Sequence, residues 1–185
     1  VRLVDCVGYL VPGVLGDKEE GEERMVSTPW AEEQIPFSRA AELGTEKVIH
    51  DHSVVGVVVT TDGSFGELPR ENFVEAEEKT IDQLKALQKP FVVILNSANP
   101  QSQKSRELAA AMEKQYEVPV LPENCQRMSE EDFDRLFHRM ILQFPACEID
   151  FMLPGYLDAL PGTHWIKATM IAQIQKWMED FDTIG

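Results

Sequence analysis

The chain has 185 residues and a formal net charge of −15, with 43% hydrophobic and 26% charged residues. This length is enough for one domain with a buried core and the start of a second, and the composition argues against disorder along the whole chain. An acidic surface repels phosphate backbones and anionic lipids, so nucleic-acid binding and docking on a membrane surface are disfavoured.

Two further features bear on location. The longest apolar run, residues 54–59, is far shorter than the roughly 20 residues that cross a bilayer, so we expect no membrane insertion. The three cysteines, Cys6, Cys125 and Cys147, are odd in number and lack metal-ligand spacing. A disulfide framework is therefore not expected, which favours a reducing compartment such as the cytoplasm.

The first forty residues contain one predicted strand and a long loop. Residues 1–8 are β-rich and are predicted to form a strand. Because a natural chain rarely begins inside a strand, we expect this sequence to be part of a longer one. Residues 8–39 lack periodicity and carry an acidic stretch at 17–23, which predicts a loop of the length that functional loops have.

Strands and helices alternate after this loop. Short apolar runs that predict strands are residues 53–60, 91–95, 118–121 and 148–153. Periodic segments that predict helices are residues 40–46, 71–88, 103–116, 129–144 and 163–181. The Val-rich run at 53–60 is typical of a strand buried on both faces, and the alternation predicts βαβ units with a parallel sheet. We expect one domain over 1–146 and the start of another over 147–185, with a linker at 154–162.

In doubly wound folds the ligand lies at the carboxyl ends of the strands. The first such end carries Asp5 and Gly8, spaced as in the Asp-x-x-Gly of P-loop GTPases. There the aspartate holds Mg²⁺ through water and the glycine N–H approaches the terminal phosphate. An ordinary strand-end turn is the alternative. Tyr9 stands where many GTPases carry a water-positioning glutamine, or it only packs.

The later strand ends are Thr60–Gly63, Asn96–Asn99 and Pro122–Asn124. Asn96 to Asn99 occupy the place of the base-reading Asn-Lys-x-Asp, with Ser97 in place of the lysine and Asn99 in place of the aspartate. An amide offers a donor and an acceptor, so guanine selectivity should be lost. We predict that Asn96, Ser97, Asn99, Glu123 and Asn124 form the base-binding set.

Three other features of the sequence say less about function. No Gly-x-x-x-x-Gly-Lys-[Ser/Thr] phosphate loop occurs; in this fold it would precede the first strand. His50-Asp51-His52 supplies too few ligands for a metal site, and a turn that enters the next strand is favoured. Trp165 and Trp177, at helical spacing, indicate a core or an interface.

The stretches VRLVDCVGYLVPGVLG, MVSTPWAEEQIPFSRAAELGTEKVIHDHSVVGVVVTTDGSF and FVVILNSANP resemble the stage IV sporulation protein A family of spore-forming bacilli and clostridia, and the similarity runs through residues 1–185. The resemblance implies a P-loop NTPase of the translation-factor GTPase class: a three-layer α/β sandwich with a mainly parallel sheet, its N-terminal part missing here, followed by the start of another α/β domain. Asp5 matches the family's Walker-B aspartate.

The resemblance also implies an activity. The family hydrolyses ATP, with Mg²⁺ as cofactor, to drive polymerisation of a shell on the forespore surface in the mother-cell cytoplasm, the base layer of the spore coat. Its partners are further copies of itself, a small amphipathic membrane anchor protein and coat morphogenetic proteins. We expect residues 1–185 alone to be inactive, since the Walker-A lysine and sensor threonines lie upstream.

Two alternatives stay open. A degenerate GTPase fold could be kept as a nonenzymatic scaffold, which Tyr9 and the altered base motif would suit. A flavodoxin-like binding module would have no phosphate loop upstream. ATP hydrolysis by the full-length protein separates the leading hypothesis from the scaffold.

Overall fold

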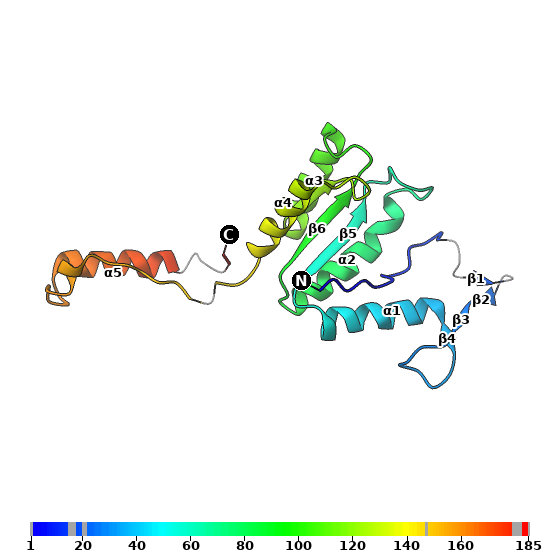
Figure 1. Cartoon of the computed structure of the whole chain (residues 1–185), viewed down its shortest axis with the longest axis horizontal. Helices are drawn as coiled ribbons and strands as arrows, with labels where there is room; N and C mark the ends of the chain where they lie inside the picture. The colour runs from blue at the N-terminus through cyan, green and yellow to red at the C-terminus, as the bar shows by residue number, and fades with distance from the viewer. Residues whose placement is uncertain (1, 15–17, 20–21, 147, 179–182, 185) are drawn as a thin grey trace. The chain divides into compact units, whose positions relative to one another are not determined.

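The structure is a computed structural model that describes residues 2–14, 18–19, 22–146, 148–178 and 183–184. It divides into two units, Val1–Met140 and Ile141–Gly185. The first unit is built on a parallel sheet of three strands in the order β5–β6–β7 (Figure 1). Their bounds are Gly56–Thr61, Phe91–Asn96 and Val120–Glu123. The predicted α/β class and parallel sheet are confirmed.

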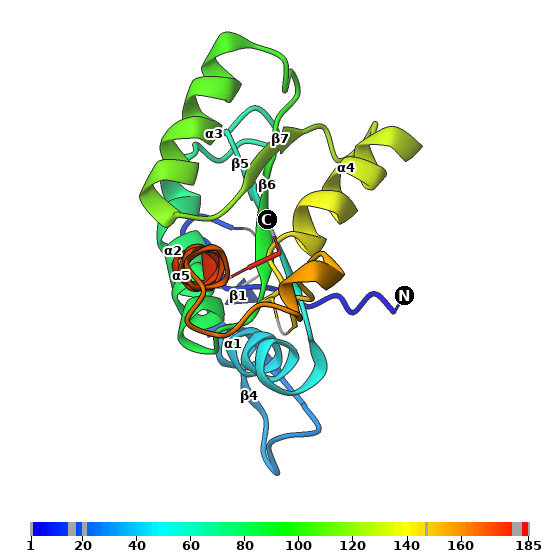
Figure 2. The same cartoon turned by 90° about the vertical axis from the view of Figure 1, so that its left-hand side faces the viewer.

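Helices cover both faces of this sheet. Figure 2 shows α2 (Glu71–Ala86) and α3 (Gln103–Tyr116) on one side and α4 (Glu130–Ile141) on the other. The larger core joins β5, β6 and β7 to α2 and α3 through side chains such as Val58, Ile81, Leu95, Met112 and Val120. The smaller core joins β6 to Leu136 of α4. All three layers therefore meet at β6, whose first five residues are buried.

The first turn of α4 is closed by Ser129 and Asp132. The Ser129 N–H donates to Asp132 Oδ2 at 2.7 Å, and the Asp132 N–H donates back to Ser129 Oγ at 3.3 Å. This reciprocal pair is the capping box, and it satisfies backbone donors that have no partner inside the helix.

The segment between α1 and β5 is a turn. Helix α1 (Phe37–Lys47) begins three residues earlier than predicted and continues into a π-helical turn, η1 (Val48–His52). Lys89 Nζ donates to the carbonyls of Ile49, His50 and Ser53 and holds this turn against the start of β6. The turn η1 directly precedes β5 and so leads the chain into that strand.

The described part of the predicted loop at 8–39 contains two short antiparallel pairs. Strand β1 (Lys18–Glu19) pairs with β2 (Glu22–Glu23), and β3 (Met25–Val26) pairs with β4 (Ile35–Pro36). The absence of a long periodic pattern is consistent with strands of only two residues.

Two expectations about the sheet are wrong. Residues 2–8 of the predicted first strand have no regular secondary structure, and Val1 lies outside the described residues. A strand needs a hydrogen-bonded neighbour, and the described backbone provides none for this segment. Strand β5 is not buried on both faces either, since Val57 and Val59 remain 41% and 59% exposed. Its other face packs on α2.

The second unit has little regular structure among its described residues. It contains a 3₁₀ turn, η2 (Gly155–Leu157), the helix α5 (Trp165–Met178) and a bridge between Pro145 and Thr183. The predicted strand at 148–153 is absent because no neighbouring strand pairs with it among the described residues. Residues 179–181 of the predicted helix lie outside the described residues.

Helix α5 has no buried residue, and Trp165 and Trp177 are exposed. Neither side chain is buried among the described residues of the second unit, so the choice between a core and an interface stays a prediction. None of the described helices has the length and apolar character required to cross a membrane.

Candidate nucleotide site

The residues predicted to bind the base lie together at the carboxyl ends of β6 and β7. Asn96 ends β6 and pairs in parallel register with Glu123, which ends β7. The Ser97 N–H then donates to the Glu123 carbonyl at 2.9 Å, which carries the pairing one residue past β6. The structure thus brings the Asn96–Asn99 loop and the Glu123–Asn124 segment to one edge of the sheet.

Amide side chains fasten these two loops to each other. Asn96 Oδ1 accepts from the Cys125 N–H at 3.0 Å, and Asn124 Nδ2 donates to the Ala98 carbonyl at 3.4 Å. The side-chain oxygen of Asn96 is therefore bonded within the protein, and the side-chain NH₂ group is the end that can face a ligand. Asn99 is exposed and presents its amide at the rim of the loop.

Ser97 takes an internal position. Only 1% of its surface is exposed, and its Oγ lies 2.9 Å from Ser105 Oγ while it accepts from the Asn99 N–H at 3.1 Å. A lysine at this position could not be held in the same way, because its long side chain would have to leave the protein interior. Ser97 therefore supports the Asn96–Asn99 loop from inside the protein.

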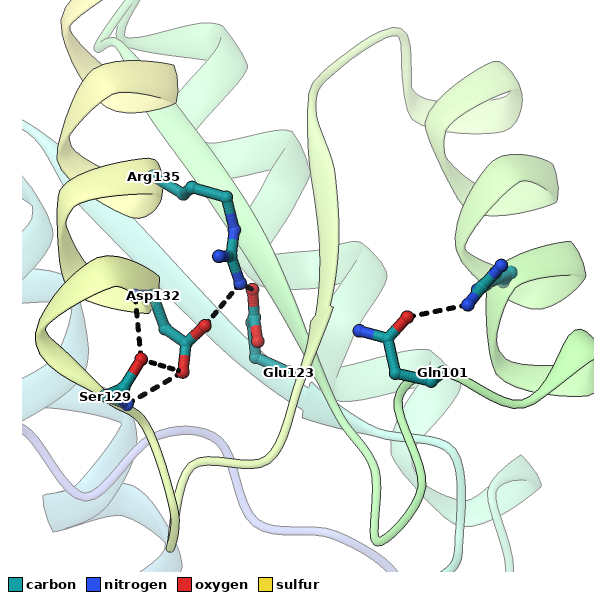
Figure 3. Close-up of polar contacts among 6 residues, drawn as sticks. Gln101, Glu123, Ser129, Asp132 and Arg135 are labelled. Carbon is teal, nitrogen blue, oxygen red and sulfur yellow. Dashed lines mark hydrogen bonds and ion pairs between the residues drawn. The ribbon is translucent and has the colours of Figure 1, made fainter.

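Glu123 is buried and paired with a cation from α4. Arg135 Nη2 donates to Glu123 Oε1 at 3.0 Å and also to Asp132, the capping residue of α4 (Figure 3). Both carboxylates raise the pKa of the Arg135 guanidinium. Glu123 therefore shares this guanidinium with Asp132, and its side chain anchors the end of β7 to α4.

Figure 3 also shows Gln101, which follows the Asn96–Asn99 loop and accepts a hydrogen bond from Arg106 Nη2 at 2.6 Å. This bond joins the segment after the loop to the first turn of α3. The loop is thus fixed at both ends, by β6 before it and by α3 after it.

Asp5 and Gly8 lie on a different segment. Together with Val57, Val59 and Thr45 they line a cavity of about 300 Å³ beside β5. Gly8 has φ +81°, a backbone conformation that favours glycine, and no atom lies within 4 Å of the place where a Cβ would be. No hydrogen bond of the described residues joins Asp5 or Gly8 to the base set, so the predicted residues form two groups.

The Asp5 group fits a magnesium ion held mainly by a nucleotide. Asp5 is exposed, and Mg²⁺ in nucleotide sites commonly takes one or two carboxylates, with water and phosphate oxygens completing its shell. The open space at Gly8 allows a close approach to its N–H. Such a site needs no cluster of three protein ligands, which agrees with the absence of one among the described residues.

Tyr9 is packed on α2. Its hydroxyl donates to Gln83 Oε1 at 2.5 Å, and Lys79 Nζ lies 4.1 Å from the centre of its ring. Burial raises the pKa of the Tyr9 hydroxyl, and the bond to Gln83 offsets part of that rise. The side chain therefore fixes the segment after Gly8 to α2 and is not placed to orient water.

One group of residues at this edge escaped the sequence-based prediction. Asp62 and Ser64 both follow β5: Asp62 hydrogen-bonds to Ser105 of α3, and Ser64 hydrogen-bonds to Ala98 of the Asn96–Asn99 loop, which we call the base loop. The sequence marks Thr60–Gly63 as a strand end with turn chemistry, which was the available signal. The contacts themselves join residues 34 and 43 positions apart, and spacing along the chain does not reveal them.

Comparison with known proteins identifies the family of the chain. Residues 1–145 match the family model described as stage IV sporulation protein A, ATPase domain. The chain is 46% identical over 184 residues to stage IV sporulation protein A of Clostridioides difficile (strain 630), and 40% identical over 180 residues to that of Bacillus anthracis. It is 39% identical over 180 residues to that of Bacillus subtilis (strain 168).

These alignments take in 97–100% of the chain and 37–38% of each relative. The chain thus spans less than half the length of the curated relatives that it matches. No solved structure matches the chain.

Proposed function

Because this chain belongs to the ATPase-domain family of stage IV sporulation protein A, we propose that its full-length protein hydrolyses ATP and uses hydrolysis to assemble a shell, the base layer of the spore coat. The observation that carries this proposal is the set of amide side chains at the ends of β6 and β7 within an ATPase domain. Asn96 occupies the first position of the base-reading motif. Asn99 occupies the position where a guanine-specific site needs an aspartate.

The amide at Asn99 suits adenine. Adenine presents an N6 donor beside an acceptor nitrogen, and an asparagine amide complements that pair with its own acceptor and donor. Guanine presents two adjacent N–H donors, which a carboxylate accepts and an amide does not. Asn99 is exposed at the loop rim, so its amide is free to turn toward a base.

We assign the phosphate side of the site to Asp5 and Gly8. Asp5 would hold Mg²⁺ through water, and Mg²⁺ neutralises charge on the phosphates during transfer. The Gly8 N–H would donate to the terminal phosphate. In a fold of the translation-factor GTPase class the phosphate loop would lie beside the edge of β5 that does not pair with β6, and the position of β5 at the end of the described sheet is compatible with this placement.

We further propose that the assembly lies on the mother-cell side of the forespore surface. Its partners are further copies of the protein, a small amphipathic membrane anchor protein and coat morphogenetic proteins. The net charge of −15 supports an indirect attachment, since an acidic domain is repelled by anionic lipid.

A nonenzymatic scaffold is the second candidate. The observation in its favour is Tyr9, which is bonded to Gln83 and stands where related enzymes carry a water-positioning side chain. The two functions differ in whether assembly requires cleavage of ATP.

Assembly of the purified full-length protein should depend on hydrolysis. With ATP and Mg²⁺ most of the protein is expected to sediment on ultracentrifugation, whereas with a non-hydrolysable ATP analogue it should stay in the supernatant. Equal sedimentation with ATP, with the analogue and without nucleotide would favour the scaffold.

Substitution of Asn99 by aspartate should move the nucleotide preference toward GTP. The carboxylate gains two guanine donors and repels the adenine acceptor, so we expect the ratio of kcat/KM for ATP to that for GTP to fall by about tenfold or more. Phosphate release with each nucleotide measures this ratio. Gln173→Glu, the same amide-to-carboxylate change at an exposed position of α5, is the matched control. An unchanged ratio in Asn99→Asp would remove Asn99 from the base pocket.

A further inference from the structure

A hydroxyl and carboxylate network lies directly under the base loop. Asp62 Oδ1 accepts from the Ser64 N–H at 2.9 Å and from the Ser64 hydroxyl, and Asp62 Oδ2 accepts from Ser105 Oγ at 3.1 Å. Ser105 Oγ also lies 2.9 Å from Ser97 Oγ and 2.8 Å from Ser102 Oγ. Asp62 thus joins the loop after β5 to the first turn of α3.

Each hydroxyl in this network has several partners. Ser97 Oγ accepts from the Asn99 N–H, and Ser102 Oγ accepts from the Ser105 N–H, so both hydroxyls can donate to Ser105 Oγ. A hydroxyl has one proton and two lone pairs. Ser105 Oγ lies 3.1 Å from two acceptors, Asp62 Oδ2 and the Asn99 carbonyl, and it therefore connects the loop after β5 to the Asn96–Asn99 loop.

The loop after β5, which carries Asp62 and Ser64, also binds the backbone of the Asn96–Asn99 loop directly. The Ala98 N–H donates to Ser64 Oγ at 2.8 Å, and the Asp62 N–H donates to the Asn96 carbonyl at 3.2 Å. Gly63 makes the required turn at φ +83°, and a Cβ there would lie 3.0 Å from the backbone nitrogen of Arg70. The turn is therefore confined on two sides, by its own backbone and by the base loop.

Burial and hydrogen bonding shift the pKa of Asp62 in opposite directions. Partial burial alone would raise the pKa of its carboxyl, but hydrogen bonds from Ser64, Ser97 and Ser105 lower it below its ordinary value. The carboxylate is consequently ionised at neutral pH.

We propose that Asp62 and Ser64 are positioning residues that hold the Asn96–Asn99 loop in the geometry that binds the nucleotide base. Asp62 orients Ser105 and Ser97, which support Asn99 from below, and Ser64 fixes Ala98 from the side. This inference rests on the proposed ATPase function and adds residues from a third strand end. Neither side chain needs to touch the nucleotide.

The test uses the full-length protein with Asp62→Asn, since asparagine keeps the size of the side chain. Its NH₂ group cannot accept the Ser105 proton, and if the amide turns around, it meets the Ser64 donors instead. In the first orientation Ser105 can donate only to the Asn99 carbonyl, and in the second the Ser64 N–H loses its acceptor. We expect KM for ATP to rise about tenfold while kcat at saturating ATP stays within about twofold of the unmodified protein. Ser64→Ala, which removes one neutral hydrogen bond to the base loop, should raise KM about threefold.

Two readouts separate positioning from general stability. Asp82→Asn, an exposed carboxylate on α2, makes the same charge change and should leave KM and kcat unaltered. Amide hydrogen exchange of residues 96–102 without nucleotide should be faster in Asp62→Asn, whereas exchange of the β6 core should not change. A lower thermal midpoint and a lower kcat with an unchanged KM would indicate a merely structural role and overturn the proposal.

The outcomes also distinguish this inference from the function on which it rests. If the unmodified protein hydrolyses ATP and Asp62→Asn has the same KM, the positioning role is wrong and the ATPase function stands. If the unmodified protein does not hydrolyse ATP, the proposed function falls, and the positioning role falls with it.

Discussion

Replacement of Asp5 by alanine in the full-length protein should abolish ATP-dependent phosphate release, with a loss of at least about 100-fold in kcat. Asp5 is exposed beside Gly8 in a segment that lines a cavity together with β5, so its carboxylate can be reached by Mg²⁺ and water. Without it the metal loses its protein anchor, and the charge on the phosphates is no longer countered in the right place. Assembly should be lost together with hydrolysis.

The control is Asp51→Ala, which removes an exposed carboxylate from the turn before β5. Asp51 lies 3.5 Å from Lys47 Nζ, and surface pairs of this kind contribute little to stability. Activity of Asp51→Ala should match that of the unmodified protein. Turnover in Asp5→Ala at the level of this control would show that the Asp-x-x-Gly spacing is only a turn.

Substitution of Glu77 by alanine is expected to cause the largest loss of stability in the first unit. Glu77 Oε1 accepts from Arg70 Nη2 at 2.7 Å and from the Tyr116 hydroxyl at 2.7 Å, and the Glu77 side chain is 1% exposed. Its removal leaves a mostly buried guanidinium without its anion, and such losses cost about 3–5 kcal/mol. Burial, then the bond to Glu77, raises the pKa of Tyr116, so this hydroxyl stays protonated as a donor.

Hydrogen exchange of the β6 amides measures this change in the full-length protein, because their exchange reports opening of the core. Their protection should fall by about 100-fold or more in Glu77→Ala. The neighbouring Glu78→Ala, at an exposed position of α2, should change protection by no more than about twofold. Equal protection in the two variants would mean that the Arg70–Glu77–Tyr116 cluster does not stabilise the unit.

Much of the central fold could be predicted from short patterns. Helix α3 agrees with its prediction at residues 103–116, and β6 extends its predicted run by a single residue. Both elements have strong local signals: an apolar run bounded by turn residues for β6, and an N-capping serine before α3. The clustering of Asn96, Asn99 and Asn124 followed from the rule that parallel strands place their carboxyl ends together.

The failed predictions share a physical cause. Residues 2–8 and 148–153 have the composition of strands, but a strand forms only where another backbone pairs with it, and composition does not supply a partner. The Val-rich sequence of β5 likewise could not indicate that only one of its faces is covered. The roles of Asp62 and Ser105 depend on contacts across 43 residues, which no local pattern encodes.

The most direct test of the central claim is phosphate release by the full-length protein with Mg²⁺ and either ATP or GTP. Amide side chains at the base loop, together with a free carboxylate at Asp5, predict sustained release from ATP and a kcat/KM for GTP at least about tenfold lower. Release from neither nucleotide, or faster release from GTP than from ATP, would contradict the account.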